Sequence, residues 1–176
     1  MSAKSNQEEY WQQAAADYGA ALERLAWAYE AEPDRRRDLM QEIHLALWRS
    51  FECFDGRCSL RTWIYRVAHN VATSHVIRQK KRNALVFRTL EEIEIEPGLE
   101  DVEESVDRQQ VLLRVLALVQ RLEFLDRQLI LAYLEGLDAE SMSQITGLSV
   151  ANVWTRVHRI KNILVRQFHS GGSDAK

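Results

Sequence analysis

The stretch from Ser141 to Arg166, SMSQITGLSVANVWTRVHRIKNILVR, holds two helical patterns on either side of one tight turn. The first run ends at Gly147. The second follows Ser149, whose hydroxyl can accept a hydrogen bond from a free N–H of the first helical turn. Apolar residues then recur within an arc of about 60° on a helix of about 100° per residue; these are Val153, Val157, Ile160 and Leu164. Two short helices joined by a glycine-containing turn predict a helix-turn-helix.

The outer face of the second helix is polar and basic. It carries Ala151, Thr155, His158, Arg159 and Asn162, with Asn152 near its edge and Trp154 and Arg156 on its flanks. No Asp or Glu occurs from residue 141 through residue 173. A helix of this kind suits the major groove of DNA. The side chains expected at base edges are Thr155, Arg159 and Asn152. The side chains expected at phosphates are Arg156, Lys161 and Arg166. A core helix pair with a solvated basic face is the alternative.

Composition favours an all-α protein of one domain or two small ones. The chain has 176 residues, 46% of them hydrophobic and 28% charged, with two prolines, seven glycines and almost no alternating strand-like runs. No apolar run approaches the length of about 18 residues that a membrane span needs. The N-terminus lacks a secretory pattern. We therefore expect a cytoplasmic protein without membrane insertion.

Charge is segregated along the chain, although the net charge is only −3. Between residues 56 and 82 every charged residue is basic: Arg57, Arg61, Arg66, Arg78, Lys80, Lys81 and Arg82. Between residues 91 and 107 every charged residue is acidic: Glu91, Glu92, Glu94, Glu96, Glu100, Asp101, Glu103, Glu104 and Asp107. Two basic blocks around an acidic one indicate two nucleic-acid contacts and a tether that avoids phosphate. Ordinary solvated faces are the alternative.

Two helices are expected at the start of the chain. Residues 10–29 form the first, which stops near Pro33 because proline cannot continue a helix interior. Asp34 is expected to cap the second. This second helix places Leu39, Ile43, Leu47, Ser50 and Phe51 on one side. The residues elsewhere on it are Asp38, Gln41, Glu42, His44 and Trp48. A tryptophan beside acids and an amide marks either a second packing face or a partner face.

A loop with aromatic neighbours follows. Phe51, Phe54 and Trp63 flank Asp55 and Gly56. The next helix, from Leu60 to Arg82, is expected to turn Leu60, Ile64, Val67, Val71 and Ser74 inward. It is expected to turn Arg61, Arg66, Asn70 and Thr73 outward. Aromatic rings beside a basic helix are typical of single-stranded nucleic-acid binding, because bases stack on rings while Arg and Lys meet phosphates. Core aromatics are the alternative.

Residues 83–107 lose helical periodicity and contain Pro97-Gly98, so they are predicted to be a linker whose ends can continue as helix. Apolar helices are then expected over residues 111–122 and 125–134. Glu135-Gly136 ends the latter, and Asp138 is expected to cap the first helix of the helix-turn-helix. The predicted domains are therefore residues 10–82 and 108–170, joined by residues 83–107.

The chain shows no enzyme signature and predicts no cofactor. Cys53, Cys58, His69 and His75 have a zinc-like spacing. The two histidines, however, would lie about 240° apart around one helix, at about 100° per residue, so one ion does not easily meet both. No metal site is therefore predicted. Without an export signal the cysteines are expected to be reduced thiols, although a Cys53–Cys58 disulfide acting as a redox switch stays open.

Taken together, these residues resemble a bacterial RNA polymerase sigma factor of the extracytoplasmic function (ECF) group, over residues 15–82 and 108–168. DLMQEIHLALWRSFECFDGRCSLRTWIYRVAHNVA resembles sigma region 2. LEFLDRQLILAYLEGLDAESMSQITGLSVANVWTRVHRIKNIL resembles sigma region 4. The resemblance implies a promoter-specificity factor that binds the largest subunits of core RNA polymerase and promoter DNA, and that is itself held by an anti-sigma factor.

The resemblance also implies roles for individual residues. Those matching the helix that grips core polymerase are Asp38, Gln41, Glu42, His44 and Trp48. Those matching the loop that captures a flipped minus-ten base are Phe54, Asp55, Gly56, Arg57, Cys58 and Ser59. Those matching the helix that opens and reads the minus-ten element are Trp63, Arg66 and Asn70. Those on the minus-thirty-five reader are Asn152, Trp154, Thr155, Arg156, His158 and Arg159. The family usually has an apolar or aromatic residue in place of His44, and often Arg or Lys in place of Trp154.

Two other functions fit parts of the sequence. A helix-turn-helix regulator could bind operator DNA without polymerase, but its first half would hold a sensor or dimer domain rather than a basic helix headed by Phe54 and Trp63. A metal- or redox-responsive switch would use Cys53 and Cys58.

Overall fold

The structure is a computed structural model that describes residues 3–87 and 108–170. Its elements are α1 (Ala3–Tyr29), α2 (Pro33–Ser50), the 3-10 turn η1 (Phe51–Cys53), α3 (Leu60–Phe87), α4 (Arg108–Gln120), α5 (Phe124–Leu134), α6 (Ala139–Thr146) and α7 (Val150–Ser170). These two ranges contain no strand, which confirms the all-α prediction. No helix within them has both the length and the hydropathy that a membrane crossing requires.

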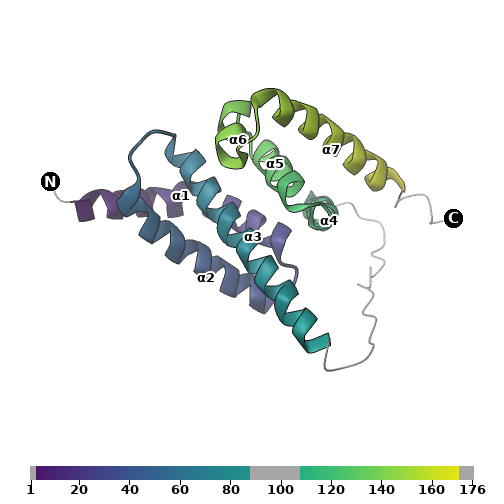
Figure 1. Cartoon of the computed structure of the whole chain (residues 1–176), viewed down its shortest axis with the longest axis horizontal. Helices are drawn as coiled ribbons and strands as arrows, with labels where there is room; N and C mark the ends of the chain where they lie inside the picture. The colour runs from purple at the N-terminus through teal and green to yellow at the C-terminus, as the bar shows by residue number, and fades with distance from the viewer. Residues whose placement is uncertain (1–2, 88–107, 171–176) are drawn as a thin grey trace.

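Helices α1, α2 and α3 pack together as the N-terminal domain (Figure 1). The predicted apolar stripe of α2 is confirmed, because Leu39, Ile43 and Leu47 are fully buried. Leu22 and Leu25 of α1 belong to the same core. Burying side chains of this size stabilises a fold by about 1.5–3 kcal/mol each, so this stripe fixes how α2 sits in the domain.

Helix α2 is capped by Glu32, one residue before Pro33, and the prediction that Asp34 caps it is wrong. The Glu32 carboxylate accepts hydrogen bonds from the backbone N–H of Asp34 at 3.0 Å and of Arg35 at 2.9 Å. These bonds lower the pKa of Glu32. Pro33 takes the first helical position, where its missing N–H costs nothing. Asp34 therefore falls inside the first turn, where it pairs with Arg37.

Helix α3 packs on two sides, against α1 and α2 on one and against α5 and α6 on the other. The predicted inward stripe is therefore only partly right. Ile64 is fully buried, but Leu60, Val67 and Val71 are partly exposed and Ser74 is exposed. The positions buried alongside Ile64 are Thr62, Tyr65, Ala68, His69, Ala72 and His75. Arg61 and Thr73, predicted to face outward, are partly buried. A helix covered on two faces has no single apolar stripe, so one-face periodicity misplaces its contacts.

Helices α4 to α7 form the C-terminal domain, and the helix-turn-helix is confirmed as α6, turn and α7. Asp138 caps α6 by accepting the N–H of Ser141 at 2.7 Å. Gly147 ends α6 at φ 76°, a left-handed conformation that glycine adopts without a Cβ penalty. Ser149 Oγ accepts the N–H of Asn152 at 3.4 Å. The predicted stripe of α7 packs inward, with Val153, Val157 and Ile160 buried.

The structure extends the helices on both sides of the predicted linker. Helix α3 continues through Phe87, and α4 begins at Arg108, three residues before the predicted start. The acidic segment and Pro97-Gly98 fall in residues 88–107, which lie outside the described residues.

The two domains pack directly against each other, α1 against α4 and α3 against α5 and α6 (Figure 1). Thr62 Oγ1 donates to Ser141 Oγ at 3.1 Å, and Gln120 Nε2 donates to the backbone oxygen of Trp27 at 2.6 Å. The guanidinium of Arg127 lies 4.9 Å from the centre of the Tyr29 ring. The described residues thus form one packed unit.

Candidate nucleic-acid interface

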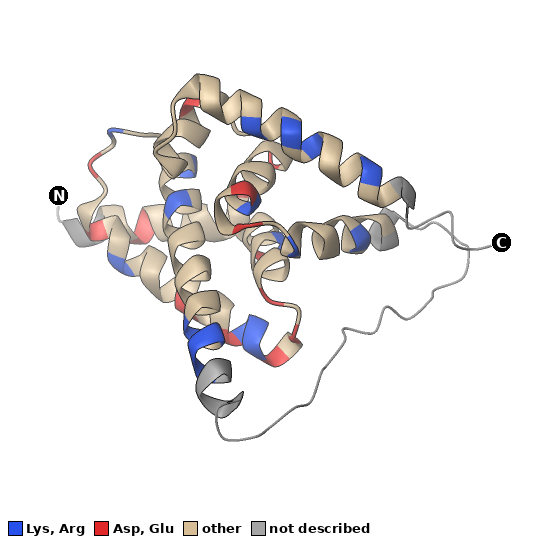
Figure 2. Ribbon diagram, turned by 45° about the vertical axis from the view of Figure 1, so that its right-hand side comes forward, with Lys and Arg blue, Asp and Glu red and all other residues tan. Residues whose placement is uncertain are grey.

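Helix α7 presents its polar face to solvent, and Figure 2 shows basic residues spaced along it. Of the predicted minus-thirty-five contacts, Asn152, Trp154, Thr155, His158 and Arg159 are exposed and Arg156 is half-buried. The side chain of Trp154 stays in solvent, since the residue is 52% exposed. The Thr155 hydroxyl donates to the backbone oxygen of Ala151 at 3.0 Å and keeps its lone pairs as acceptors.

The two arginines of this face share one carboxylate. Arg156 Nη1 donates to Asp126 Oδ1 at 2.8 Å, and Arg159 Nη2 donates to Asp126 Oδ2 at 2.7 Å. Asp126 lies in the first turn of α5 and is only 7% exposed. No pattern in the sequence predicted this contact, because Asp126 is 30 and 33 residues away from its partners. Helix α7 is therefore held against α5 by these charged contacts as well as by its apolar stripe.

The loop before α3 is built around an aromatic cluster. The Phe54 ring lies 5.3 Å from Trp63 and 5.1 Å from Tyr10, measured between ring centres. Gly56 turns the chain at φ 74°. Asp55 accepts the N–H of Arg57 at 3.1 Å and also pairs with its Nε at 2.9 Å. The loop thus carries a hydrogen-bonded turn beside aromatic rings in tilted and edge-to-face contact.

Ser59 and Cys58 complete the loop. Ser59 Oγ accepts the N–H of Thr62 at 3.0 Å, so this hydroxyl caps the start of α3. Cys58 is half-buried and Cys53 is exposed, and both are free thiols. His69 and His75, which share their zinc-like spacing, are both buried in α3. In the described ranges no group of three His, Cys, Asp or Glu is placed to hold a metal ion.

Trp63, Arg66 and Asn70 follow one another along α3. Trp63 Nε1 donates to Ser50 Oγ at 2.9 Å, which fixes the indole against α2. The Arg66 guanidinium lies 4.6 Å from the centre of the Trp63 ring, a cation–π contact. Asn70 is exposed one turn farther on. The indole is therefore held on two sides while remaining partly open to solvent.

Two of the predicted polymerase-binding residues of α2, His44 and Trp48, lie against α1, whereas Glu42 lies against α3. Asp38, Gln41 and His44 are exposed, while Glu42 and Trp48 are half-buried. The rings of His44 and Trp48 lie 5.4 and 6.0 Å from Trp11 of α1. Partial burial of the His44 ring lowers the pKa of His44, with Glu23 partly opposing that shift, so the neutral imidazole predominates at pH 7. A neutral ring among tryptophans is a close physical substitute for the apolar or aromatic residue usual in the family.

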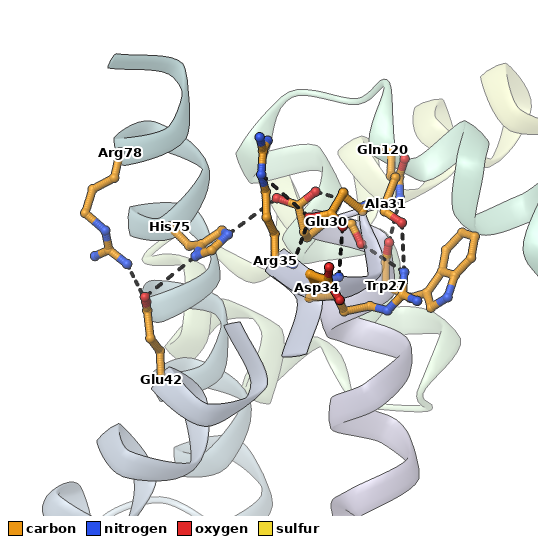
Figure 3. Close-up of polar contacts among 11 residues, drawn as sticks. Trp27, Glu30, Ala31, Asp34, Arg35, Glu42, His75, Arg78 and Gln120 are labelled. Carbon is orange, nitrogen blue, oxygen red and sulfur yellow. Dashed lines mark hydrogen bonds and ion pairs between the residues drawn. The ribbon is translucent and has the colours of Figure 1, made fainter. Parts of the chain in front are cut away.

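Glu42 is joined to α3 by basic groups (Figure 3). It pairs with Arg78, and one of its oxygens lies 3.8 Å from His75 Nδ1. The other ring nitrogen of His75 lies 3.4 Å from a Glu30 oxygen. Helix α3 thus fixes the position of Glu42 on the α2 surface. The sequence did not predict which residues lie next to these α2 side chains; they are Trp11, Glu30, His75 and Arg78.

Comparisons with known proteins agree with both domains. The family model "Sigma-70 region 2" matches residues 15–82, and the model "Sigma-70, region 4" matches residues 112–164. The chain is 27% identical to the RNA polymerase sigma-H factor of Pseudomonas aeruginosa, over 73% of this chain and 70% of the relative. It is 28% identical to the ECF RNA polymerase sigma-E factor of Haemophilus influenzae, over 72% of this chain and 71% of the relative.

Two solved structures share the fold. The sigma factor RpoE of Bartonella quintana, solved in complex with the anti-sigma factor NepR, has a TM-score of 0.67 and 22% identity, covering 90% of this chain and 96% of that one. CnrH, solved in complex with the cytosolic domain of CnrY, has a TM-score of 0.65 and 21% identity, covering 96% of this chain and 92% of that one.

The first half matches region 2, where a stand-alone regulator was expected to carry a sensor or dimer domain. Region 2 and region 4 occur in one chain, in family order and on an all-α scaffold. The chain therefore belongs to the sigma-70 family, in its extracytoplasmic function group, and is a promoter-specificity factor that directs RNA polymerase to start transcription at a particular set of promoters.

Proposed function

We propose that the two domains, residues 10–82 and 108–170, act on different parts of the transcription machinery. In this proposal the N-terminal domain binds core polymerase and opens the minus-ten element, and the C-terminal domain binds duplex at the minus-thirty-five element. The observation that carries the proposal is the exposed basic face of α7, on a chain whose other basic helix, α3, begins at an aromatic cluster. Duplex reading needs the first feature and strand opening needs the second.

We propose that core polymerase binds to the exposed surface of α2. The residues assigned to it are Asp38, Gln41, Glu42, His44 and Trp48. Its chemistry supports docking, because α2 exposes an acid and an amide, Asp38 and Gln41, on the same helix as the half-buried Trp48. Half-exposed tryptophans surrounded by polar groups are typical of the residues that carry most of the binding energy in interfaces. The contacts of Glu42 with Arg78 and His75 support its role by holding the carboxylate in place.

We propose that the loop before α3 and the first turns of α3 bind the minus-ten element. The residues assigned are Phe54, Asp55, Gly56, Arg57, Cys58, Ser59, Trp63, Arg66 and Asn70. Opening duplex costs a few kcal/mol per extruded base, and stacking on a ring is worth about 1–3 kcal/mol per base. The Trp63 ring, with Arg66 on one face, would exchange that cation–π contact for a base and release Arg66 to a phosphate.

For the minus-thirty-five element we propose the outer face of α7. The residues assigned are Asn152, Trp154, Thr155, Arg156, His158 and Arg159. Asn and Arg can each make two hydrogen bonds to a base edge in the major groove, and Trp154 adds an apolar surface that suits a thymine methyl. The exposure of Trp154 is compatible with this use, since its indole is accessible to such a contact in the free chain.

The proposal requires the domains to separate on promoter DNA. Elements about 25 base pairs apart lie about 85 Å apart along B-DNA, at about 3.4 Å per base pair. In the free chain α3 packs on α6 and α6 packs on α7, so the two readers lie about two helix spacings, roughly 20 Å, apart. Residues 88–107, if extended, can span up to about 70 Å. The interdomain contacts therefore belong to the free or inhibited protein and break in the initiating complex.

We also propose that the chain catalyses no reaction itself, works in the cytoplasm and is held in check by an anti-sigma protein. The Bartonella quintana relative was solved with such a partner, and this chain matches 96% of that relative's length. The surfaces assigned to polymerase and to promoter DNA are the ones such a partner would have to cover.

Run-off transcription tests the proposal. Purified chain and bacterial core RNA polymerase are mixed with fragments of the source genome, and transcript starts are mapped. Starts that appear only with the chain, and share a sequence near minus-thirty-five, support the proposal and identify the promoter. If stable binding of duplex occurs without binding of polymerase, the N-terminal assignment fails.

A further inference from the structure

Asp126 pairs with two arginines, one more than is needed to neutralise its buried carboxylate. The residue is 7% exposed, and a buried carboxylate is stabilised once one cation pairs with it. Here each oxygen accepts from a different arginine, Arg156 at 2.8 Å and Arg159 at 2.7 Å. The three side chains together keep a net charge of +1. The second arginine therefore calls for an explanation other than neutralising the acid.

The two arginines differ in how far they extend into solvent. The side chain of Arg156 is 35% exposed and that of Arg159 is 55% exposed. A guanidinium has five N–H donors in a rigid plane, and the carboxylate uses one donor from each. An arginine held at one edge can still offer its other edge to a guanine or a phosphate. Its orientation is then set before DNA arrives, so fewer rotamers are lost on binding.

We propose that Asp126 is a positioning residue for promoter recognition: it orients Arg156 and Arg159 on the reading face of α7 and limits their attraction to phosphates. Contacts to bases then contribute a larger share of the binding free energy, and sequence-independent attraction to phosphates a smaller one, than they would without Asp126. This inference rests on the proposed function of α7 as the minus-thirty-five reader. It adds a residue of α5, outside the helix-turn-helix, to the determinants of promoter specificity.

The variant Asp126→Asn keeps the size of the side chain and removes its charge. Full-length holoenzyme is assayed on the strongest promoter found by run-off transcription and on the same duplex with its minus-thirty-five segment scrambled. We expect the preference for the intact promoter to fall about tenfold, the discrimination that one well-placed bidentate pair supplies. We also expect binding to the scrambled duplex to depend more steeply on salt, by about one phosphate equivalent.

Asp138→Asn is the matched control. It makes the same change in net charge in the same domain, and Asn remains a good N-cap for α6. Its promoter preference and salt dependence are expected to match those of the wild type. A purely structural role for Asp126 would lower thermal stability without changing either quantity in the folded fraction.

Two further arms keep the outcome decisive. If Asp126→Asn does not fold, Asp126→Glu tests the same point, since it keeps the charge but displaces the carboxylate by one methylene. Promoter preference should then fall several-fold with unchanged salt dependence, and unchanged preference overturns the inference. If wild-type holoenzyme itself fails to distinguish the two duplexes, the proposed function of α7 fails. If the wild type distinguishes the two duplexes and the Asp126 variants do so equally well, the proposed role of Asp126 is refuted while that of α7 stands.

Discussion

Glu135, the C-cap residue of α5, accepts two hydrogen bonds from Arg24 of α1, one from Nε at 2.6 Å and one from Nη2 at 2.8 Å. Arg61 of α3 donates to the backbone oxygen of the same residue. The hydrogen bond to Glu135 raises the pKa of the Arg24 guanidinium. Glu135 of the C-terminal domain thus accepts hydrogen bonds from two helices of the N-terminal domain, α1 and α3. Its contacts stabilise the packed arrangement of the two domains, which the proposed function requires to open on promoter DNA.

Replacing Glu135 with alanine should loosen this arrangement. The Arg24 side chain is 38% exposed, so solvent screens the pair, and its loss is expected to cost about 1 kcal/mol, or roughly fivefold in the closed-to-open ratio. Small-angle X-ray scattering of the free chain should show a larger radius of gyration. Glu140→Ala, at an exposed acid of α6, is the control. An unchanged radius in Glu135→Ala would show that other contacts hold the domains together.

Two glycine substitutions should change stability in opposite directions. Gly147 lies at φ 76°, so Gly147→Ala should lower the free energy of unfolding by about 1 kcal/mol through backbone strain. Gly19 lies within α1, and a Cβ there meets no atom within 4 Å, so Gly19→Ala should raise it by about 0.5–1 kcal/mol. Urea denaturation measures both. A loss of stability from both changes would indicate that Gly19 has a packing role.

The buried His69 should make stability depend on pH. Burial lowers its pKa to about 3, and its Nδ1 lies 3.1 Å from the hydroxyl of Tyr29, whose own pKa burial raises to about 12. The unfolded chain protonates this histidine below about pH 6.5 while the folded chain does not. The stability it contributes is therefore complete above about pH 6.5 and is lost as the pH falls toward 3.

His69→Gln isolates this effect, because glutamine does not titrate and the remaining groups cancel in the comparison. Between pH 7 and pH 5 the free energy of unfolding of the wild type should fall by about 2 kcal/mol more than that of the variant. Denaturation curves at the two pH values give both numbers. Equal losses in the two proteins would mean that His69 gains a proton in the folded state.

Trp63 should act in strand opening. Trp63→Ala removes the ring beside Phe54, and transcription from a duplex promoter should fall about tenfold, in line with one lost stacking interaction. A template already unpaired at minus-ten should restore most of the activity. Trp63→Phe keeps a ring without the Nε1 bond to Ser50 and should lose less. If the unpaired template restores nothing, Trp63 serves docking or folding instead of opening.

Local signals allowed the helix-turn-helix to be predicted from sequence nearly residue by residue. Asp138 and Gly147 act within a few residues of their own positions, and the stripe of Val153, Val157 and Ile160 needs only one buried face. The same holds for Leu39, Ile43 and Leu47 in α2. Patterns of this kind are set by short-range geometry, which a sequence displays directly.

Contacts between distant elements could not be predicted in this way. The burial of Thr62 and Tyr65 depends on α5 and α6 covering a second face of α3. The contacts of Asp126 with Arg156 and Arg159 join residues of two helices that no periodicity connects. The Asp34 cap was misplaced for a more local reason, because Pro33 at the first helical position shifted the cap to Glu32. The assigned contact residues for polymerase and DNA remain predictions.

The most direct test of the two-domain account compares two tryptophan variants in one assay. Trp48→Ala and Trp154→Ala make the same chemical change on opposite domains, and each is measured for core polymerase affinity and for minus-thirty-five-dependent transcription at saturating chain. We expect at least tenfold weaker polymerase binding only for Trp48→Ala. We expect reduced promoter preference, with normal polymerase binding, only for Trp154→Ala. Loss of polymerase binding in Trp154→Ala alone, or no effect of Trp48→Ala, would contradict the assignment of docking to α2 and of promoter reading to α7.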